Sequence, residues 1–246
     1  MATVTWNEEI AVAYDATSAA MYEPAVLDPT VNLLAELSNG GPALEFAIGT
    51  GRVALPLIER GIDVHGIELS THMVDQLKLK PGGANLPVTI GDMSCTLVSK
   101  KFKLVYLVWN GIMNVTTQAE QTAVFQNAAT HLAPGGRFVI EVIVPQLQRV
   151  PVGDNARVFM NEPGHVGIET FDDLVGQISW SHHWMNVGGR MIHDSAPYRY
   201  VWPSELDLMA IIAGLQLQDR WSDWKRSEFT SNSVNQIAVF RKPQTS

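Results

Sequence analysis

Short apolar runs alternate with amphipathic segments from residue 43 onward. The apolar runs cover 43–48, 62–68, 87–90, 104–109 and 137–144. Apolar residues at helical spacing mark the segments 53–60, 70–79 and 118–132. Runs that lack polar alternation are typical of strands buried on both faces of a parallel sheet. This alternation of strands and helices predicts a doubly wound, open α/β sheet.

Two helices are predicted ahead of this pattern, within residues 1–42. Residues 7–20 carry apolar side chains at helical spacing. Asp28-Pro29 offers an N-cap followed by proline at the first helical position, so a second helix is predicted to begin there. Within the alternating region, Thr117 and Glu120 have the spacing of a capping box.

The alternation stops after Pro145 and gives way to a β-rich stretch. Strand-like pieces are predicted around 156–160, 174–185 and 191–201, and Gly188-Gly189 is a candidate hairpin turn. A connection of this length is typical of a functional lid. We therefore predict that residues 150–202 are an insertion that covers a substrate site.

The alternation resumes after the insertion. Ser204 and Asp207 have the spacing of a second capping box, and strands are predicted over 215–221 and 234–241. We expect one domain, 1–246. Its predicted parts are the N-terminal helices (1–42), a cofactor-binding core (43–149), the lid (150–202) and a closing helix with strands (203–246).

Composition narrows the class of protein. A chain of 246 residues with 46% hydrophobic and 17% charged residues can bury a full core. Its net charge of −8 argues against nucleic acid as a partner, because phosphate contacts need clustered Lys and Arg. The apolar runs are too short to span a membrane, and the first residues do not resemble a signal peptide. A single cysteine, Cys95, predicted to be buried, fits a cytoplasmic protein.

A glycine loop follows the first predicted strand. Gly49 and Gly51 allow a close approach of the backbone to a ligand, and the next helix offers free N–H groups. Glu68, at the end of the second predicted strand, is placed to accept the hydroxyls of a ribose. With Ala54, the two glycines also satisfy the dinucleotide fingerprint, so a nicotinamide cofactor stays an alternative.

Three neighbouring features favour a different cofactor. Glu45 lies four residues before Gly49, where a carboxylate repels a pyrophosphate and attracts a cationic amino end. Gly91-Asp92-Met93 places a second carboxylate at the carboxyl edge of the sheet. The segment Leu-Ala-Pro-Gly-Gly-Arg-Phe, 132–138, precedes the fifth strand.

In this order, ALEFAIGTGR, GIDVHGIELS, GDM and HLAPGGRFVIEV resemble class I S-adenosylmethionine-dependent methyltransferases. The chain is similar to bacterial small-molecule enzymes such as the amino-sugar N-methyltransferases. The resemblance implies a Rossmann-like, seven-stranded sheet with an antiparallel closing strand. It implies S-adenosylmethionine as cofactor and a set of cofactor-binding residues: Tyr14, Glu45, Ala47, Gly49, Gly51, Glu68, Leu69, Asp92, Met93 and Trp109.

The chain departs from the family pattern at two positions. Ala47 stands at the first glycine of the family's loop, which is tolerable only if that backbone position has a negative φ. Lys103 stands where relatives often carry Asp before the fourth strand.

Candidates for the acceptor side come from the geometry of open sheets, in which ligands sit beyond the carboxyl ends of the strands. Asn110 and Glu141 are candidates from the core, and His182 and Tyr198 are candidates from the insertion. Along a strand, Trp180, His182 and Trp184 share one face and His183 takes the other. A pocket role for these tryptophans competes with a simple role in the insertion's own core. The histidines match no known metal-ligand spacing, so no metal is predicted.

We therefore expect a methyltransferase that moves a methyl group from S-adenosylmethionine to nitrogen or oxygen of a small molecule beneath the lid. Two alternatives stay open, namely an NAD(P)-dependent oxidoreductase and a non-catalytic protein that binds S-adenosylmethionine. Use of a general base is left open, because methyl transfer from a sulfonium does not require one. The aromatic insertion is also a candidate homodimer interface.

Overall fold

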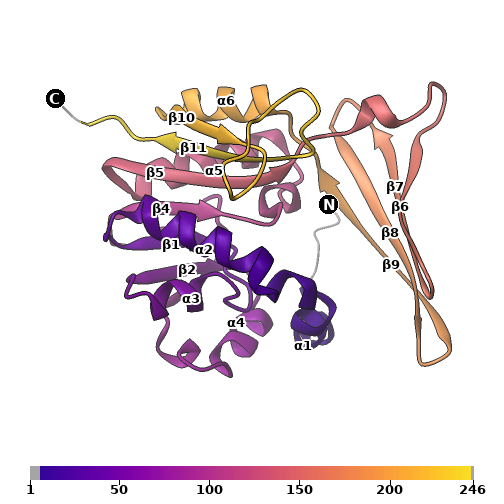
Figure 1. Ribbon diagram of the computed structural model, residues 1–246, viewed down its shortest axis with the longest axis horizontal. Helices are drawn as coiled ribbons and strands as arrows, with labels where there is room; N and C mark the ends of the chain where they lie inside the picture. Colours follow the sequence, from indigo (N-terminus) through magenta and orange to yellow (C-terminus); the bar gives the residue numbers. More distant parts are fainter. Residues whose placement is uncertain (1–5, 245–246) are drawn as a thin grey trace.

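A seven-stranded sheet forms the centre of the protein (Figure 1). The computed structural model describes residues 6–244, without the side chain of Val187. The strands are β1 (Ala43–Phe46), β2 (Val64–Glu68), β3 (Val88–Ile90), β4 (Phe102–Leu107), β5 (Leu132–Ile143), β10 (Gln216–Trp221) and β11 (Asn235–Arg241). Their order is β10-β11-β5-β4-β1-β2-β3. β1 to β5 pair in parallel and β11 is antiparallel to both neighbours, which confirms the predicted sheet and its closing strand.

Helices cover both faces of this sheet. They are α1 (Glu8–Thr17), η1 (Ala19–Tyr22), α2 (Pro24–Ser38), α3 (Ala54–Glu59), α4 (Thr71–Lys78), η2 (Gly83–Asn85), η3 (Gly111–Asn114), α5 (Gln118–His131), η4 (Leu147–Arg149) and α6 (Pro203–Ile212). Leu34 of α2 and Leu57 of α3 belong to one apolar cluster, whereas Phe125 of α5 and Leu206 of α6 belong to another. Because successive strand side chains point to opposite faces, the buried strands contribute to both clusters.

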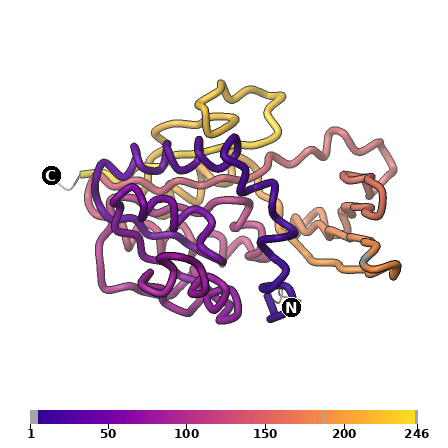
Figure 2. The backbone as a smooth tube through the Cα atoms, turned by 60° about the horizontal axis from the view of Figure 1, so that its bottom comes forward, coloured from indigo at the N-terminus to yellow at the C-terminus, as the bar shows by residue number. Residues whose placement is uncertain are grey.

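The insertion folds as a separate four-stranded antiparallel sheet. Its strands are β6 (Ala156–Glu162), β7 (His165–Asp173), β8 (Ile178–Val187) and β9 (Arg190–Arg199), in that order. The sheet stands to one side of the rest of the molecule, here called the body, in both views (Figures 1 and 2). The sequence predicted three strands, and β7 was missed because its polar residues and Gly167 hide the strand pattern. The Gly188-Gly189 turn is confirmed, with φ of 59° and 82°.

Two predicted helix starts are wrong. α2 begins at Pro24, which takes the first helical position, so Asp28 and Pro29 lie inside the helix. α6 begins at Pro203 without a side-chain cap, and Asp207 pairs with Arg220 instead of capping. The capping box of α5 is confirmed. There, the Thr117 hydroxyl accepts the Glu120 N–H at 3.2 Å.

Cys95 is exposed, so the prediction of a buried thiol is wrong. β3 ends at Ile90, and Cys95 lies in the turn that follows, where its N–H donates to the Asp92 carbonyl at 3.1 Å. Within residues 6–244, no helix combines the length and the apolar character that a membrane span requires.

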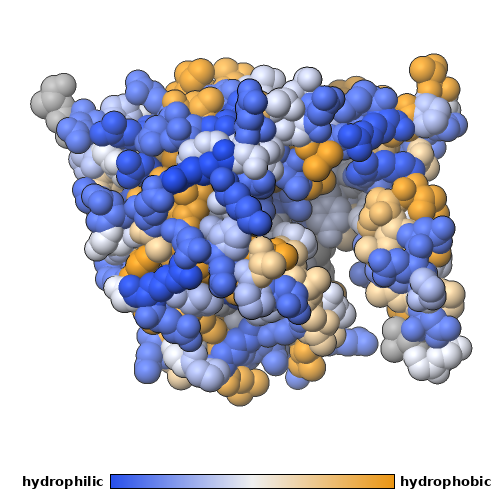
Figure 3. Space-filling view, in the orientation of Figure 1, coloured by the Kyte–Doolittle hydropathy of each residue, from blue (hydrophilic) through white to orange (hydrophobic). Residues whose placement is uncertain are grey.

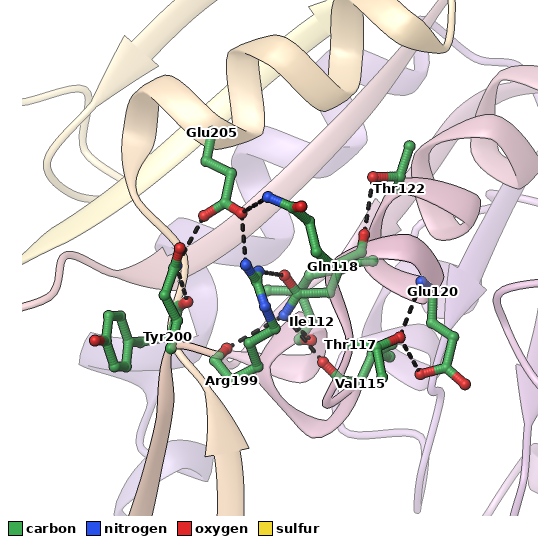
Figure 4. Close-up of polar contacts among 11 residues, drawn as sticks. Ile112, Val115, Thr117, Gln118, Glu120, Thr122, Arg199, Tyr200 and Glu205 are labelled. Carbon is green, nitrogen blue, oxygen red and sulfur yellow. Dashed lines mark hydrogen bonds and ion pairs between the residues drawn. The ribbon is translucent and has the colours of Figure 1, made fainter. Parts of the chain in front are cut away.

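A buried polar network ties the insertion to the body (Figure 4). Arg199, at the end of β9, is 3% exposed and donates to Gln121 Oε1 of α5 at 2.5 Å and to Glu205 Oε1 of α6 at 2.6 Å. The Gln121 amide also donates to the carbonyls of Ile112 and Val115, at 3.1 and 3.0 Å. The network therefore links the base of the insertion to the η3 loop of the body.

Candidate active site

The glycine loop lies between β1 and α3 and takes left-handed backbone conformations. φ is 51° at Ala47, 55° at Gly49 and 79° at Gly51. The left-handed backbone at Gly51 favours glycine, and a Cβ there would also lie 2.9 Å from Leu77 Cδ1. The expectation of a negative φ at Ala47 is wrong. Ala47 takes this left-handed conformation although it carries a Cβ, at a cost of about 1–2 kcal/mol.

Glu68, at the end of β2, holds the loop in place. Its side chain is 5% exposed, and its two carboxylate oxygens accept the N–H of Gly49 at 2.8 Å and of Ser70 at 2.9 Å. Burial raises the pKa of Glu68, and these backbone donors act in the opposite direction. A carboxylate has about four acceptor positions, so Glu68 retains acceptor capacity toward a ligand.

Glu45 is enclosed in β1, where it accepts the hydroxyl of Tyr106 at 2.9 Å. Burial raises the pKa of Glu45 to about 8, against the smaller opposing effects of Tyr106 and of Arg52. Glu45 nevertheless lines the same cavity as Glu68. A cation placed beside Glu45 would favour its ionised form.

Asp92 and Met93 follow β3 at the same edge of the sheet. The Asp92 carboxylate is exposed, and its Oδ1 accepts the N–H of Ser94 at 2.7 Å. Met93 is buried, whereas Leu69, directly after Glu68, is 55% exposed. All three line the cavity, so a polar group and two apolar side chains face the same space.

The N-terminal helix is fastened to the glycine loop. The Asp15 carboxylate accepts the hydroxyls of Thr50 at 2.6 Å and of Tyr22 at 2.5 Å, and it pairs with Lys80. Next to it, Tyr14 lines the cavity, and burial raises the pKa of its phenol. Helix α1 therefore closes the loop side of the cavity, where the sequence placed Tyr14.

Trp109 and Asn110 turn the chain away from the end of β4. Both have left-handed backbones, with φ of 54° and 58°, and both line the cavity. Trp109 is 44% exposed, so it lies outside the core of the sheet. Glu141 does not line the cavity. Its carboxylate accepts the Trp109 N–H and the Trp224 indole N–H, each at 2.8 Å, so it braces the turn.

The insertion's sheet turns one face toward the cavity. Ser181, His183 and Tyr198 line the cavity from this inner face, as do Phe159 and the ion pair of Arg157 with Glu169. Among these, Tyr198 was predicted from the sequence as an acceptor-side candidate. Arg157, Phe159, Glu169 and Ser181 were not predicted. For Arg157 and Phe159, the irregularity between Val158 and Met160 breaks the alternation on β6. The cross-strand pairing of Arg157 with Glu169 could be read only with the strand register known.

His182 faces the other way, so its placement on the acceptor side is wrong. Its ring stacks at 6.4 Å on Trp180 and at 5.9 Å on His193, and it also packs against Trp184. None of these four side chains is among those that line the cavity. The predicted sharing of one strand face by Trp180, His182 and Trp184 is confirmed, and that face is the outer one.

The glycine loop and the insertion enclose one continuous cavity of about 650 Å³. Its two ends differ in chemistry. Glu45, Glu68 and Asp92 lie at one end, and the inner face of the insertion lies at the other. Figure 3 shows the molecule hollowed between body and insertion. The three acidic residues selected from the sequence are thus brought together, although they come from separate strand ends.

Comparisons with known proteins agree with this geometry. A family model described as a methyltransferase domain matches residues 43–136. The CcbJ methyltransferase from Streptomyces caelestis is 32% identical, with 87% of this chain and 88% of that chain covered and a TM-score of 0.78. An S-adenosylmethionine-dependent methyltransferase from Clostridium acetobutylicum is 14% identical (92% and 98% covered, TM-score 0.73). CalS10, an amino pentose methyltransferase from Micromonospora echinaspora, is 19% identical (93% and 96% covered, TM-score 0.68). No curated protein matches the chain.

The domain match covers the glycine loop, Glu68 and Asp92, and the match to CcbJ extends over most of both chains. These matches give no support to the oxidoreductase alternative. The chain belongs to the S-adenosylmethionine-dependent methyltransferases, and S-adenosylmethionine is its methyl donor.

Proposed function

We propose that this methyltransferase acts on nitrogen or oxygen of a small molecule held between the body and the insertion. One observation carries the proposal: a single cavity of about 650 Å³ joins the acidic strand ends to the inner face of the insertion. A volume in this range is typical of sites that enclose a small ligand. The insertion, residues 150–202, then acts as the substrate lid.

The acidic end of the cavity suits S-adenosylmethionine. Burial raises the pKa of the Glu45 carboxyl. The cationic amino end of the cofactor would supply the compensating positive charge. Glu68 would accept the ribose hydroxyls and Asp92 would accept from the adenine edge, with Leu69 and Met93 against the ring. When bound, the cofactor supplies an electrophilic methyl group.

The protein's own task is to orient the acceptor and exclude water. Trp109, Asn110 and the inner face of the insertion form the walls available for this task. Polar groups such as Ser181 and Glu169 stand beside aromatic rings such as Phe159, a mixture suited to a ring that carries polar substituents. CalS10 is an amino pentose methyltransferase and KedS8 a sugar N-methyltransferase. This supports an amine on a ring as the preferred acceptor.

A panel of acceptors tests the proposal. The purified protein is incubated with S-adenosylmethionine and, separately, with glucosamine, proline, a catechol, a short RNA and an unstructured peptide, and S-adenosylhomocysteine is measured. We expect turnover of at least one small amine or hydroxyl compound. Turnover confined to the RNA or the peptide would overturn the small-molecule acceptor.

Two variants test the cofactor end without any acceptor. We expect Glu68→Ala and Asp92→Ala each to weaken the binding of S-adenosylhomocysteine, measured calorimetrically, by about tenfold or more, because a hydrogen bond to a charged group is worth about 1.5–3 kcal/mol. Asp75→Ala, which removes an exposed carboxylate on α4, is the matched control and should bind as the wild type does. Wild-type affinity in both test variants would remove these residues from the cofactor site.

We also propose that the protein acts in the cytoplasm without a nucleic-acid partner, and that it forms a homodimer. The net charge of −8 supports the exclusion of nucleic acid. The aromatic outer face around Trp184 is the surface offered for the dimer. Sedimentation of the wild type and of Trp184→Ser tests it, since a dimer held there dissociates in the variant.

A further inference from the structure

Three polar side chains form a hydrogen-bonded row on the inner face of the insertion. Ser181 Oγ lies 3.0 Å from His183 Nε2, and His183 Nδ1 lies 2.8 Å from His165 Nε2. Ser181 and His183 come from β8 and line the cavity, whereas His165 comes from β7 and does not line it. This row of hydrogen bonds therefore leads from the cavity into the insertion.

The surroundings keep His183 uncharged near neutral pH. Its ring packs edge-on against Phe159, with centroids 5.3 Å apart. Burial lowers the pKa of His183, and His165 and, to a smaller extent, His182 lower it further. Asp194, directly across on β9, acts in the opposite direction. The same face also carries the phenol of Tyr198 and the Arg157–Glu169 ion pair, in which the charges compensate each other.

Two proton arrangements satisfy these hydrogen bonds. In one, His183 carries its proton on Nδ1, donates it to His165, and accepts the Ser181 hydroxyl at Nε2. In the other, His165 donates to His183, which then donates from Nε2 to Ser181. Only the first arrangement leaves His183 able to take a proton from the cavity.

We propose that Ser181 and His183 act together as the proton acceptor for the substrate, with His165 as a positioning residue that fixes the tautomer. This deepens the proposed function and rests on it. The acceptor loses one proton for each methyl group it gains. As its N–H or O–H bond breaks, the proton passes to Ser181 Oγ, the Ser181 proton passes to His183 Nε2, and His183 becomes an imidazolium. The new bond from the acceptor to the methyl carbon replaces the carbon–sulfur bond, whose electron pair stays on sulfur.

Nitrogen NMR of the histidine rings tests the pair without any acceptor. The His183 signals are assigned by their loss in His183→Gln. We expect a neutral ring at pH 7 with its proton on Nδ1, and a change in the Nε2 signal in Ser181→Ala. A ring with its proton on Nε2, or a cationic ring at pH 7, would overturn the proposal.

Kinetics with an acceptor that the panel yields provide the second arm. We expect His183→Gln to lower kcat by about 10²-fold or more. We also expect this variant to lose the fall in rate that the wild type shows as acid protonates His183. His182→Gln is the matched control, because this neighbouring histidine lies on the outer face, and it should keep both the rate and the pH profile. Binding of S-adenosylhomocysteine should be unchanged in either variant.

A wild-type rate and pH profile in His183→Gln would also overturn the proposal, whichever tautomer His183 adopts. A panel without turnover counts against the small-molecule acceptor, and the ring tautomer then decides by itself whether the pair can take a proton. The two failures are thus distinguishable.

Discussion

The three carboxylates of the cavity have different surroundings, and burial raises the pKa of two of them, Glu45 and Glu68. Glu68 accepts two backbone N–H groups, and Asp92 is exposed to water. Glu45 is enclosed in the sheet, where it accepts the neutral phenol of Tyr106. Burial without sufficient compensation raises its pKa to about 8, so the ligand-free protein holds Glu45 largely protonated at neutral pH.

Glu45 therefore makes the stability of the ligand-free protein depend on pH. Between its ordinary pKa of 4.5 and about 8, folded chains keep on Glu45 a proton that unfolded chains have lost. The free energy of unfolding then falls as pH rises through this window, by at most about 1.4 kcal/mol per pH unit from this group. In Glu45→Gln this contribution is absent, so the variant gains stability relative to wild type as pH rises. Urea unfolding of the wild type and of Glu45→Gln, near pH 4.5 and near pH 8, measures this difference.

Glu59→Gln provides the control for this measurement, because Glu59 is an exposed carboxylate at the end of α3. The free energy of unfolding of Glu59→Gln should follow that of the wild type at every pH. A Glu45→Gln curve that runs parallel to the wild type would show that Glu45 titrates near its ordinary pKa.

Ala47 is a strained residue at the centre of the glycine loop. Its φ of 51° is a conformation that costs an L-residue with a Cβ about 1–2 kcal/mol, and glycine nothing. We expect Ala47→Gly to raise the free energy of unfolding by about 1 kcal/mol, which is a rise of about 2–4 °C in Tm for a chain of this size. Thermal unfolding without ligand measures it. Ala35→Gly, inside α2, should lower the free energy of unfolding. If Ala47→Gly lowered it too, the loop would hold no strain at Ala47.

At the scale of elements, the sequence predicts those whose determinants are local. The buried strands of the body follow from continuous apolar runs, and the start of α5 follows from Thr117 and Glu120. The start of α2 was misplaced because Pro24 and Pro29 both satisfy the same preference for an early helical position, and the helix begins at the first of them. β7 was missed because its stability comes from pairing with β6 and β8 and not from its own apolar pattern.

The elements of body and insertion meet at Arg199. Its charge is 3% exposed and is balanced by Glu205, itself largely buried, so removing it leaves a carboxylate without its partner. We expect Arg199→Met to lower the free energy of unfolding by about 3–5 kcal/mol. Lys100→Met, which breaks the exposed pair with Asp63, should change it by less than about 1 kcal/mol. Urea unfolding compares the two, and equal small effects would show that Arg199 does not anchor the insertion.

At the scale of the whole molecule, the two ends of the cavity differ in how far sequence could predict them. Glu45, Glu68 and Asp92 each follow from a strand end next to them in the chain, and parallel strands bring such ends to one edge of the sheet. Ser181 and His183 are brought to the cavity by the packing of the insertion against the body, which no local pattern encodes. The grouping of residues at the acidic end of the cavity was therefore predicted, and most residues of the opposite end were not.

The same architecture predicts a difference in local stability. The body's strands are buried between two apolar clusters, whereas the insertion's sheet has one face toward the cavity and lies outside both clusters for most of its length, with its anchor at the end of β9. Regions with few buried apolar contacts open at a lower free energy than the core. We expect backbone amides of β6 and β7 to exchange with deuterium at an opening free energy about 2 kcal/mol or more below that of β1, β4 and β5.

Saturating S-adenosylhomocysteine, at about 100 times its Kd, adds about 2.7 kcal/mol to the free energy of unfolding of the element that binds it. That gain should appear in the body and not in β6 and β7, whereas an equal gain in both would mean that the insertion and body open as one unit.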